Sequence, residues 1–212
     1  MSETSYQQRK DYQLKYEHQI NEQIERKINL ETKKANLHRQ QIKQTLAVWL
    51  DTSDTKYHLT LSFPVGTNEI KTKELLNQLI KHLNRSIYKK RYDTGQSYIE
   101  GFAIREPTPS MNTDHYHILM VDDGWLPDYK RMDSLISKQV EYLQSRPTER
   151  VVKRNFISSH LLQEYYNKGN NGLENYLLKQ IDYRSNSIQK VNDSIGTLGK
   201  GNVLFGRERF DG

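Results

Sequence analysis

The segment HYHILMV at residues 115–121 constrains the fold most, because two histidines flank a tyrosine at its start and an apolar run follows them. Successive side chains of a β-strand point to opposite faces, so residues two apart point the same way. His115 and His117 would then lie side by side on one face, with Ile118 and Met120 packed beneath. Two neutral imidazoles on a rigid strand supply half of a divalent-metal site. The alternative is one structural and one exposed histidine on a half-buried strand.

Composition excludes several classes of protein. The 212 residues include no cysteine, which rules out disulfides, zinc–thiolate sites and thiol nucleophiles. No apolar stretch approaches the length of a membrane span, and the N-terminus lacks the pattern of a signal peptide, so we expect a cytoplasmic protein without a membrane partner. The net charge of +6 is compatible with a polyanionic partner. The fourteen tyrosines could stack on bases or simply edge a sheet.

The first 50 residues are predicted to form a polar helical arm. Apolar residues recur at roughly helical spacing over residues 1–47, and no glycine or proline interrupts them. The apolar stripe is thin, so the helix needs a partner, either the main domain or a second copy of itself. The stripe consists of Ile20, Ile24, Ile28, Leu37, Ile42 and Leu46.

The main domain, residues 51–190, is predicted to alternate strands and helices. The expected strands are 56–64, 98–105, 116–121 and 151–157, and the expected helices are 75–87, 128–144 and a broken region at 158–181. This order predicts an α+β fold with an antiparallel sheet and helices on one face. Residues 191–212 are glycine-rich and are predicted to form a loose tail, although residues 203–205 could dock as an edge strand.

Three motifs follow one another in an informative order. They are YHLTLSF at residues 57–63, HYH at 115–117 and YLLK at 176–179. This order resembles the HUH (His–hydrophobe–His) endonucleases, specifically the single-tyrosine rolling-circle replication initiators (Rep) of plasmids, filamentous phages and cryptic prophages, the last two being most similar. The resemblance covers about residues 55–185 and implies an RRM-like antiparallel palm. Tyr116 is bulkier and more polar than the family's usual middle residue.

The resemblance implies a metal-dependent, sequence-specific single-stranded DNA endonuclease that nicks an origin. Tyr176 would be the nucleophile, forming a 5′-phosphotyrosyl link and leaving a 3′-OH that primes replication. Lys179, on the same helical face, would stabilise the phenolate or contact the scissile phosphate. His115 and His117 would hold Mg²⁺ or Mn²⁺ together with an oxygen ligand.

Two site positions remain open. Glu106 is the favoured third ligand, because it lies where the family's strand ends before its His pair, and Glu100 is the alternative. Either glutamate could instead be a solvated carboxylate. Tyr176 is the favoured nucleophile because leucines give its helix a buried side, although it could also be structural. Tyr165 begins a second Tyr-x-x-Lys motif eleven residues earlier and is its rival.

Two groups of residues are predicted to contact DNA. Thr60 and Ser62 share a face of the first strand, which in the family borders the bound single strand, so their hydroxyls would contact phosphates or bases. Ordinary β-propensity is the alternative. Lys89, Lys90 and Arg91 could bind the origin hairpin, or could be a solvated helix end stabilised by its cations.

Competing functions and partners follow from other patterns. His58-Leu59-Thr60 is the half-motif of the 2H phosphoesterases, but the chain has no second His-x-Thr or His-x-Ser. A non-catalytic DNA-binding replication or regulatory protein could share the HUH fold. The chain has no P-loop pattern, so we expect a host helicase and polymerase as partners, and the arm could mediate a homo-oligomer.

Overall fold

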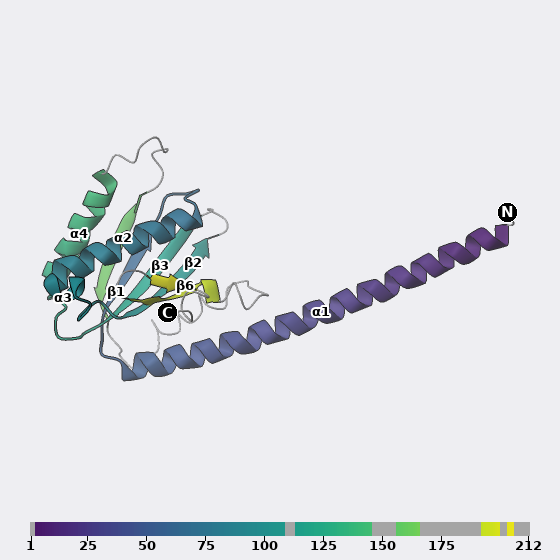
Figure 1. Cartoon of the computed structure of the whole chain (residues 1–212), viewed down its shortest axis with the longest axis horizontal. Helices are drawn as coiled ribbons and strands as arrows, with labels where there is room; N and C mark the ends of the chain where they lie inside the picture. Colours follow the sequence, from purple (N-terminus) through teal and green to yellow (C-terminus); the bar gives the residue numbers. More distant parts are fainter. Residues whose placement is uncertain (1–2, 109–112, 146–155, 166–191, 200–202, 206–212) are drawn as a thin grey trace.

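The computed structural model describes residues 3–108, 113–145, 156–165, 192–199 and 203–205 (Figure 1). The helices are α1 (Glu3–Thr52), α2 (Glu69–Tyr88), α3 (Lys90–Asp93) and α4 (Tyr129–Ser145). The strands are β1 (Thr55–Ser62), β2 (Gly101–Thr108), β3 (Thr113–Val121), β4 (Ser159–Glu164), β5 (Ile195–Leu198) and β6 (Val203–Phe205). The six described strands form an antiparallel sheet in the order β4-β1-β3-β2-β5-β6, which confirms the expected α+β fold class.

One face of the sheet carries the larger apolar core, beneath α2 and α4. Alternation along β1 directs Tyr57, Leu59 and Leu61 into this core, where all three are fully buried. Asn68 precedes α2, and its side chain accepts a hydrogen bond from the N–H of Ile70 and so caps the helix. The apolar side of α2 then covers the sheet with Leu75, Leu76, Leu79, Ile80 and Leu83.

The opposite face of the sheet is packed by the C-terminal part of α1. Leu46 and Leu50 are buried there against Ile104, Leu119 and Ile195. The ring of Trp49 also meets the edge of the Phe102 ring, with 4.7 Å between centroids. The main domain is therefore the partner of this part of the predicted apolar stripe.

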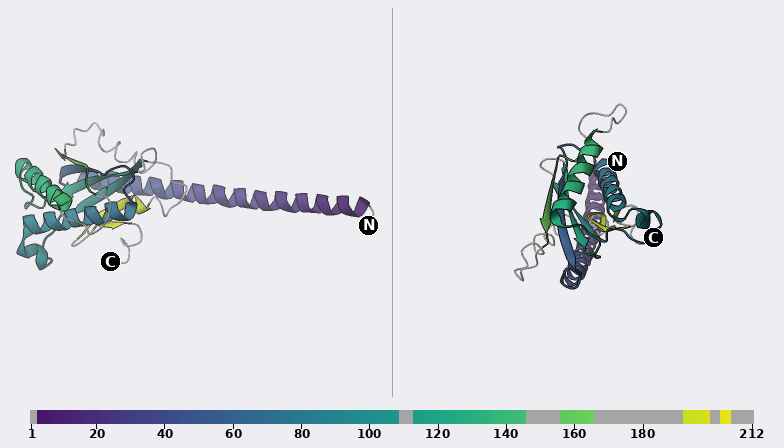
Figure 2. Two further views of the ribbon diagram at one scale, coloured as in Figure 1. Left: turned by 90° about the horizontal axis from the view of Figure 1, so that it is seen from above. Right: turned by 90° about the vertical axis from the view of Figure 1, so that its left-hand side faces the viewer.

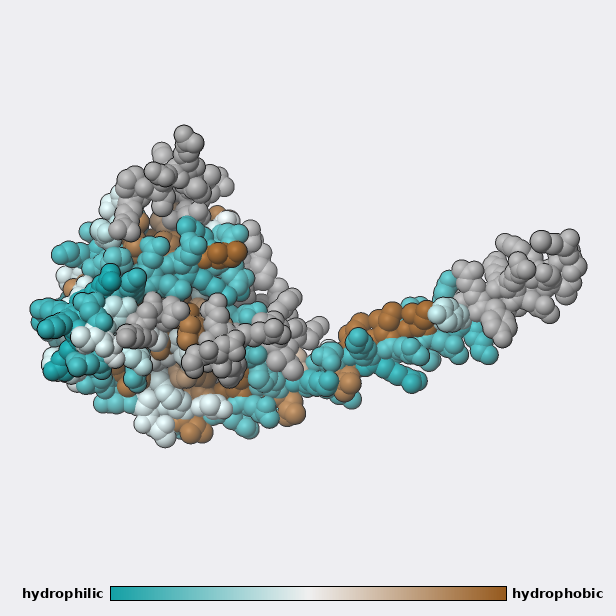
Figure 3. Space-filling model, viewed as in Figure 1, coloured by the Kyte–Doolittle hydropathy of each residue, from teal (hydrophilic) through white to brown (hydrophobic). Residues whose placement is uncertain are grey.

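The rest of α1 extends away from the domain (Figure 2). Ile20, Ile24 and Ile28 are 37%, 50% and 56% exposed, and Figure 3 shows apolar side chains along this part of the arm. In the described parts of the chain, no helix combines the length and the apolar content needed to cross a bilayer.

The prediction of a helix over residues 158–181 was wrong at its start, where the chain forms β4. The edge of β1 offers unpaired backbone groups, and β4 pairs with it so that Leu162 lies opposite Leu59 in the core. Adjacent leucines at 161 and 162 resemble a helical pattern, but Leu161 is 56% exposed on the other face. The strand predicted at 151–157 lies mostly outside the described residues.

The described part of the predicted tail belongs to the sheet. β5 pairs with β2, and β6 is the edge strand that residues 203–205 were expected to provide. A Cβ atom on Gly196 would come within 2.6 Å of the Val203 side chain, so glycine here permits close packing. The side chain of Asn77 on α2 accepts a hydrogen bond from the Val203 N–H at 2.7 Å. The predicted end of the main domain at residue 190 therefore does not separate β5 and β6 from that domain.

Packing of α1 on the sheet predicts unequal effects of two leucine truncations on one helix. Leu46→Ala should lower the free energy of unfolding by about 2–5 kcal/mol, because it opens a cavity beside Leu119. Leu37→Ala should change it by no more than about 0.5 kcal/mol, because Leu37 is 59% exposed. Urea unfolding measures both, and equal effects would contradict the packing described.

Candidate metal centre

Three neighbouring strands bring six polar side chains to the sheet face opposite α2 and α4. β1 supplies His58, Thr60 and Ser62, β3 supplies His115 and His117, and β2 supplies Glu106. The antiparallel register places Thr60 directly opposite His117 and Ser62 directly opposite His115. Tyr116 and Ile118 point into the helical core, so the two histidines share a face as the alternation predicts.

A hydroxyl group contacts the Nδ1 atom of each histidine of the pair. Ser62 Oγ lies 2.9 Å from His115 Nδ1, and Thr60 Oγ1 lies 3.3 Å from His117 Nδ1. When the Nδ1–H donates to the hydroxyl oxygen, as His115 can do to Ser62, the lone pair of the imidazole is on Nε2. The neutral His117 ring instead donates its Nε2–H to the Glu106 carboxylate in this structure, so its Nδ1 accepts. Histidines that bind metals are held in this way by a partner on the other ring nitrogen. Thr60 and Ser62 are therefore placed to orient the imidazoles, and the direct DNA contact predicted for them stays a prediction.

Glu106 lies beside the pair and Glu100 does not. Glu106 Oε2 is 3.0 Å from His117 Nε2, and Glu106 is the cross-strand neighbour of His115. Glu100 precedes β2, and its carbonyl accepts a hydrogen bond from the N–H of Val121 at the far end of β3. The structure thus places only the favoured glutamate with the histidines.

His58 is a member of this cluster that the sequence analysis considered only as part of a phosphoesterase half-motif. It is 3% exposed, and its Nε2 lies 3.2 Å from His117 Nδ1 with the two rings stacked. The spacing of 58, 60 and 62 was a signal that His58 shares this face. Its contact with His117 depends on strand register, which local spacing does not specify.

Burial keeps the two inner imidazoles neutral near pH 7. Desolvation lowers the pKa of His58 to about 4, and the neighbouring charge of His117 acts in the same direction. Desolvation also lowers the pKa of His117, which outweighs the opposing effect of its hydrogen bond with Glu106. A neutral imidazole has a lone pair available, whereas an imidazolium does not.

The donor types fit a divalent cation, but the donors do not converge on one point in this structure. Among the described residues, no three His, Asp or Glu side chains already point at one shared position as metal ligands. Glu106 is bonded directly to His117, and His115 is near enough for its charge to lower the pKa of His117. Two imidazoles and a carboxylate on adjacent strand positions are donors for a divalent cation, and the carboxylate is the donor type that Mn²⁺ and Mg²⁺ prefer. Binding would need the Glu106 carboxylate and the His115 ring to turn towards a common point.

The favoured nucleophile and its lysine, Tyr176 and Lys179, lie outside the described residues. Tyr165 directly follows β4, and its N–H donates to the carbonyl of Lys56. It is partly buried against the apolar cluster beneath α1. Leu161 is the β4 residue beside Thr60 and the His117 row, so Tyr165 is four residues, or about 13 Å, further along the strand. That separation exceeds the length of a tyrosine side chain.

The predicted basic run also lies away from the histidine cluster. Lys89, Lys90 and Arg91 lie at the C-terminal end of α2 and in α3, within the helical layer on the other side of the sheet.

No family model matches the chain, and no curated protein matches it either. Assignment of a function therefore depends on the geometry of the site itself.

The buried His58 predicts acid sensitivity of the metal-free protein. Its pKa is about 4 in the folded chain against 6.5 for an unperturbed histidine, so the unfolded chain binds the proton first as the pH falls. The free energy of unfolding should therefore decrease between pH 6.5 and pH 4, by about 3 kcal/mol from this group. Urea unfolding in EDTA at a series of pH values measures the decrease.

Two histidine variants control this measurement. His58→Gln should flatten the decrease between pH 6.5 and pH 4, whereas His18→Gln should leave it unchanged, because His18 lies in the exposed part of α1. An unaltered pH dependence in His58→Gln would contradict the assigned pKa.

Proposed function

We propose that the chain is an HUH-type DNA endonuclease and strand transferase that initiates rolling-circle replication. It would nick a specific single-stranded origin sequence through a 5′-phosphotyrosyl intermediate and later rejoin the strand. The observation that supports this most is the pair of imidazoles, each held at Nδ1 by a hydroxyl of the adjacent strand, beside the carboxylate of Glu106. Such an arrangement would give a divalent cation the Nε2 lone pair of His115, and that of His117 once its proton has moved to Nδ1 and Glu106 has left Nε2.

The roles of the residues follow from their chemistry. His115, His117 and Glu106 hold Mg²⁺ or Mn²⁺, which when bound stabilises negative charge on the scissile phosphate. The phenol of Tyr176 loses its proton and its oxygen attacks phosphorus, a new O–P bond forms, and the bond to the 3′-oxygen breaks, with that oxygen taking up a proton to leave as the 3′-OH. Lys179 provides positive charge near the phenolate. Thr60 and Ser62 act on DNA through the imidazoles that they orient.

The proposal includes the partners expected of an initiator without a motor domain. The substrate is single-stranded DNA or an origin hairpin in the cytoplasm, and a host helicase and polymerase extend the 3′-OH. The exposed isoleucines at 20, 24 and 28 support self-association through the arm, because an unpartnered apolar stripe gains stability when buried.

A non-catalytic DNA-binding protein on the same fold is the second candidate. It would keep the basic residues of α2 and α3 and would not need paired hydroxyl–imidazole contacts. A 2H phosphoesterase is less well supported, because the chain lacks a second His-x-Thr or His-x-Ser and Thr60 contacts His117 within the same cluster.

Covalent adduct formation tests the nucleophile. Incubation with single-stranded origin DNA and Mn²⁺ should give a protein–DNA adduct that denaturing electrophoresis detects and that EDTA abolishes. Tyr176→Phe should lose the adduct, because it removes the attacking oxygen, whereas Tyr165→Phe should retain it. Tight binding of origin DNA without any adduct would favour the non-catalytic protein, and loss of the adduct only in Tyr165→Phe would reassign the nucleophile.

The hydroxyl contacts predict a metal-affinity defect with a matched control. Ser62→Ala should raise the Mn²⁺ concentration for half-maximal cleavage about 10- to 100-fold, because it removes the partner of His115 Nδ1. Ser137→Ala also removes a hydroxyl from an imidazole, that of His160 on the helical face, and should leave the Mn²⁺ requirement unchanged. Similar requirements in the two variants would show that Ser62 does not position a metal ligand.

A further inference from the structure

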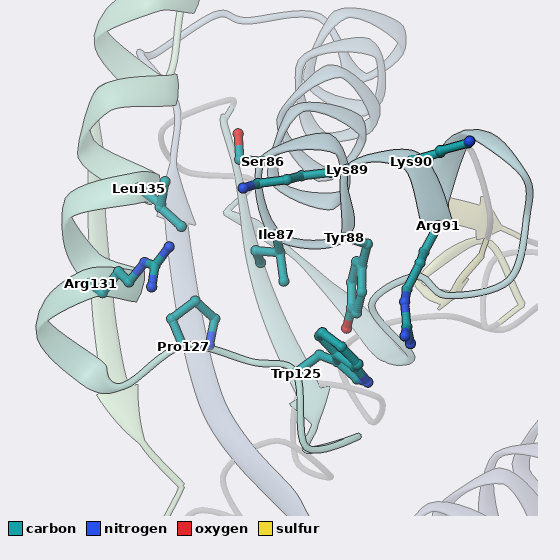
Figure 4. A pocket seen from close by; sticks show the side chains of 10 residues that line it. All are labelled: Ser86, Ile87, Tyr88, Lys89, Lys90, Arg91, Trp125, Pro127, Arg131 and Leu135. Atoms are coloured by element: carbon teal, nitrogen blue, oxygen red, sulfur yellow. The ribbon is translucent and has the colours of Figure 1, made fainter.

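A second concave site lies in the helical layer, far from the histidines. The cavity has a volume of about 390 Å³, and its walls come from the end of α2, from α3, from the β3–α4 loop and from α4. Ile87, Pro127 and Leu135 provide apolar surface in it (Figure 4). The loop begins where β3 ends, six residues or about 20 Å along the strand from His115. A ligand in this cavity therefore does not touch the metal centre.

Four cations surround the cavity, and its lining includes no acidic residue. They are Lys89, Lys90, Arg91 and Arg131. In the described ranges none of the four forms an ion pair, whereas the nearby Arg85 is paired with Asp93. Figure 4 shows Lys89 and Arg131 on facing walls and Lys90 directed outward. The cavity therefore gathers four cations between α2 and α4, with the Asp122 and Asp123 carboxylates of the adjacent loop near its lining residue Tyr88.

The carboxylates of the adjacent loop are already engaged. Asp122 forms an ion pair with Lys56 at 2.9 Å and accepts a hydrogen bond from the Gly124 N–H. Asp123 accepts a hydrogen bond from the N–H of Trp125 at 3.0 Å. These bonds fix the loop and, with it, the position of the indole.

An exposed aromatic ring forms part of the cavity wall. Trp125 is 50% exposed, and the guanidinium of Arg91 lies 4.0 Å from its ring centroid. Figure 4 shows the ring beside Tyr88, whose pKa is raised by burial and by the nearby Asp123 carboxylate. A half-exposed indole beside cations provides a stacking surface for a planar, negatively charged ligand.

Lys89 occupies its position with a strained backbone. Its φ of 51° is positive, which among the described residues is true of no other non-glycine residue. It separates α2 from α3 and carries its ammonium group across the cavity. A glycine would adopt this conformation with less strain, so a lysine at this position lowers the stability of the fold.

We propose that this cavity binds one nucleotide unit of single-stranded DNA, with the base against Trp125 and a phosphate between Lys89 and Arg131. The choice of DNA rests on the proposed function. An acidic peptide would use the cations and leave the indole without a planar partner, so a nucleotide matches more of the surface. The cavity would bind a DNA nucleotide outside the cleavage site, on the opposite side of the sheet from the scissile phosphate.

Fluorescence quenching of Trp125 by tetrathymidylate tests this site directly. The chain has two tryptophans, so a Trp49→Phe background leaves Trp125 as the sole indole. Titration in EDTA at low salt should give saturable quenching, because a stacked base contacts the ring. Tetraglutamate and inorganic phosphate at equal charge should quench little. Quenching by either of them to the same extent, or none by tetrathymidylate, would overturn the proposal.

Variants in this background separate binding from folding. Lys89→Gly should raise the melting temperature by a few degrees while weakening oligonucleotide binding and reducing the salt dependence of log K by about 0.7. Lys138→Ala removes an equal charge two turns along α4 from Arg131 and should bind normally. Trp125→Ala should weaken binding of a labelled oligonucleotide about 5- to 150-fold. Equal loss of binding in Lys89→Gly and Lys138→Ala would indicate nonspecific attraction and overturn the assignment.

His117→Ala distinguishes the two proposals. It should abolish adduct formation on origin DNA while leaving the quenching of Trp125 unchanged. In the wild-type protein, quenching without an adduct would overturn only the endonuclease, and an adduct without quenching would overturn only the nucleotide site.

Discussion

The register between β1 and β3 is the constraint on which the candidate site depends. It sets Ser62 opposite His115 and Thr60 opposite His117, and a slip of one residue would turn every site residue of β1 towards the helices. That slip is prevented by the other face, where Tyr57, Leu59 and Leu61 are fully buried. The alternation that forms the hydrophobic core therefore also aligns the hydroxyls with the imidazoles, so core packing and site geometry depend on one another.

The sheet face that carries the candidate site has a part covered by α1 and, further along the strands, a partly exposed part. Leu119 lies beneath α1 with Leu46 and Leu50, and His117 follows two residues back along the same face of β3. His58 and His117 are 3% exposed and neutral, whereas His115, Glu106 and the two hydroxyl residues are partly exposed. The inner imidazoles are thus protected from protonation, and the outer groups face the position that a ligand would occupy. On the other side of the sheet, the cavity at Trp125 is built in a similar way, because a fixed loop positions the indole while the groups that would bind a ligand are exposed.

Strong periodicity explains which features the sequence could predict. The alternation at 57–62 and 115–121 predicted two central strands and the shared face of His115 and His117, and the stripe of α2 predicted its buried side. β4 was missed because a short edge strand is stabilised by pairing with β1 and not by its own pattern. β5 was missed because Gly196 suggested flexibility, whereas the glycine permits the close approach of β6. The contacts of His58 and Ser62 with the His pair join residues 59 and 53 positions apart, which local spacing cannot predict.

Location of a bound metal ion tests the central claim most directly. A crystal of the full chain soaked in Mn²⁺ should show an anomalous peak in contact with His115, His117 and Glu106, while Ser62 and Thr60 keep their bonds to the Nδ1 atoms. The Glu106 carboxylate should then have left its direct contact with His117. No peak at saturating Mn²⁺, or a peak held through the Nδ1 atoms, would contradict the account of the site.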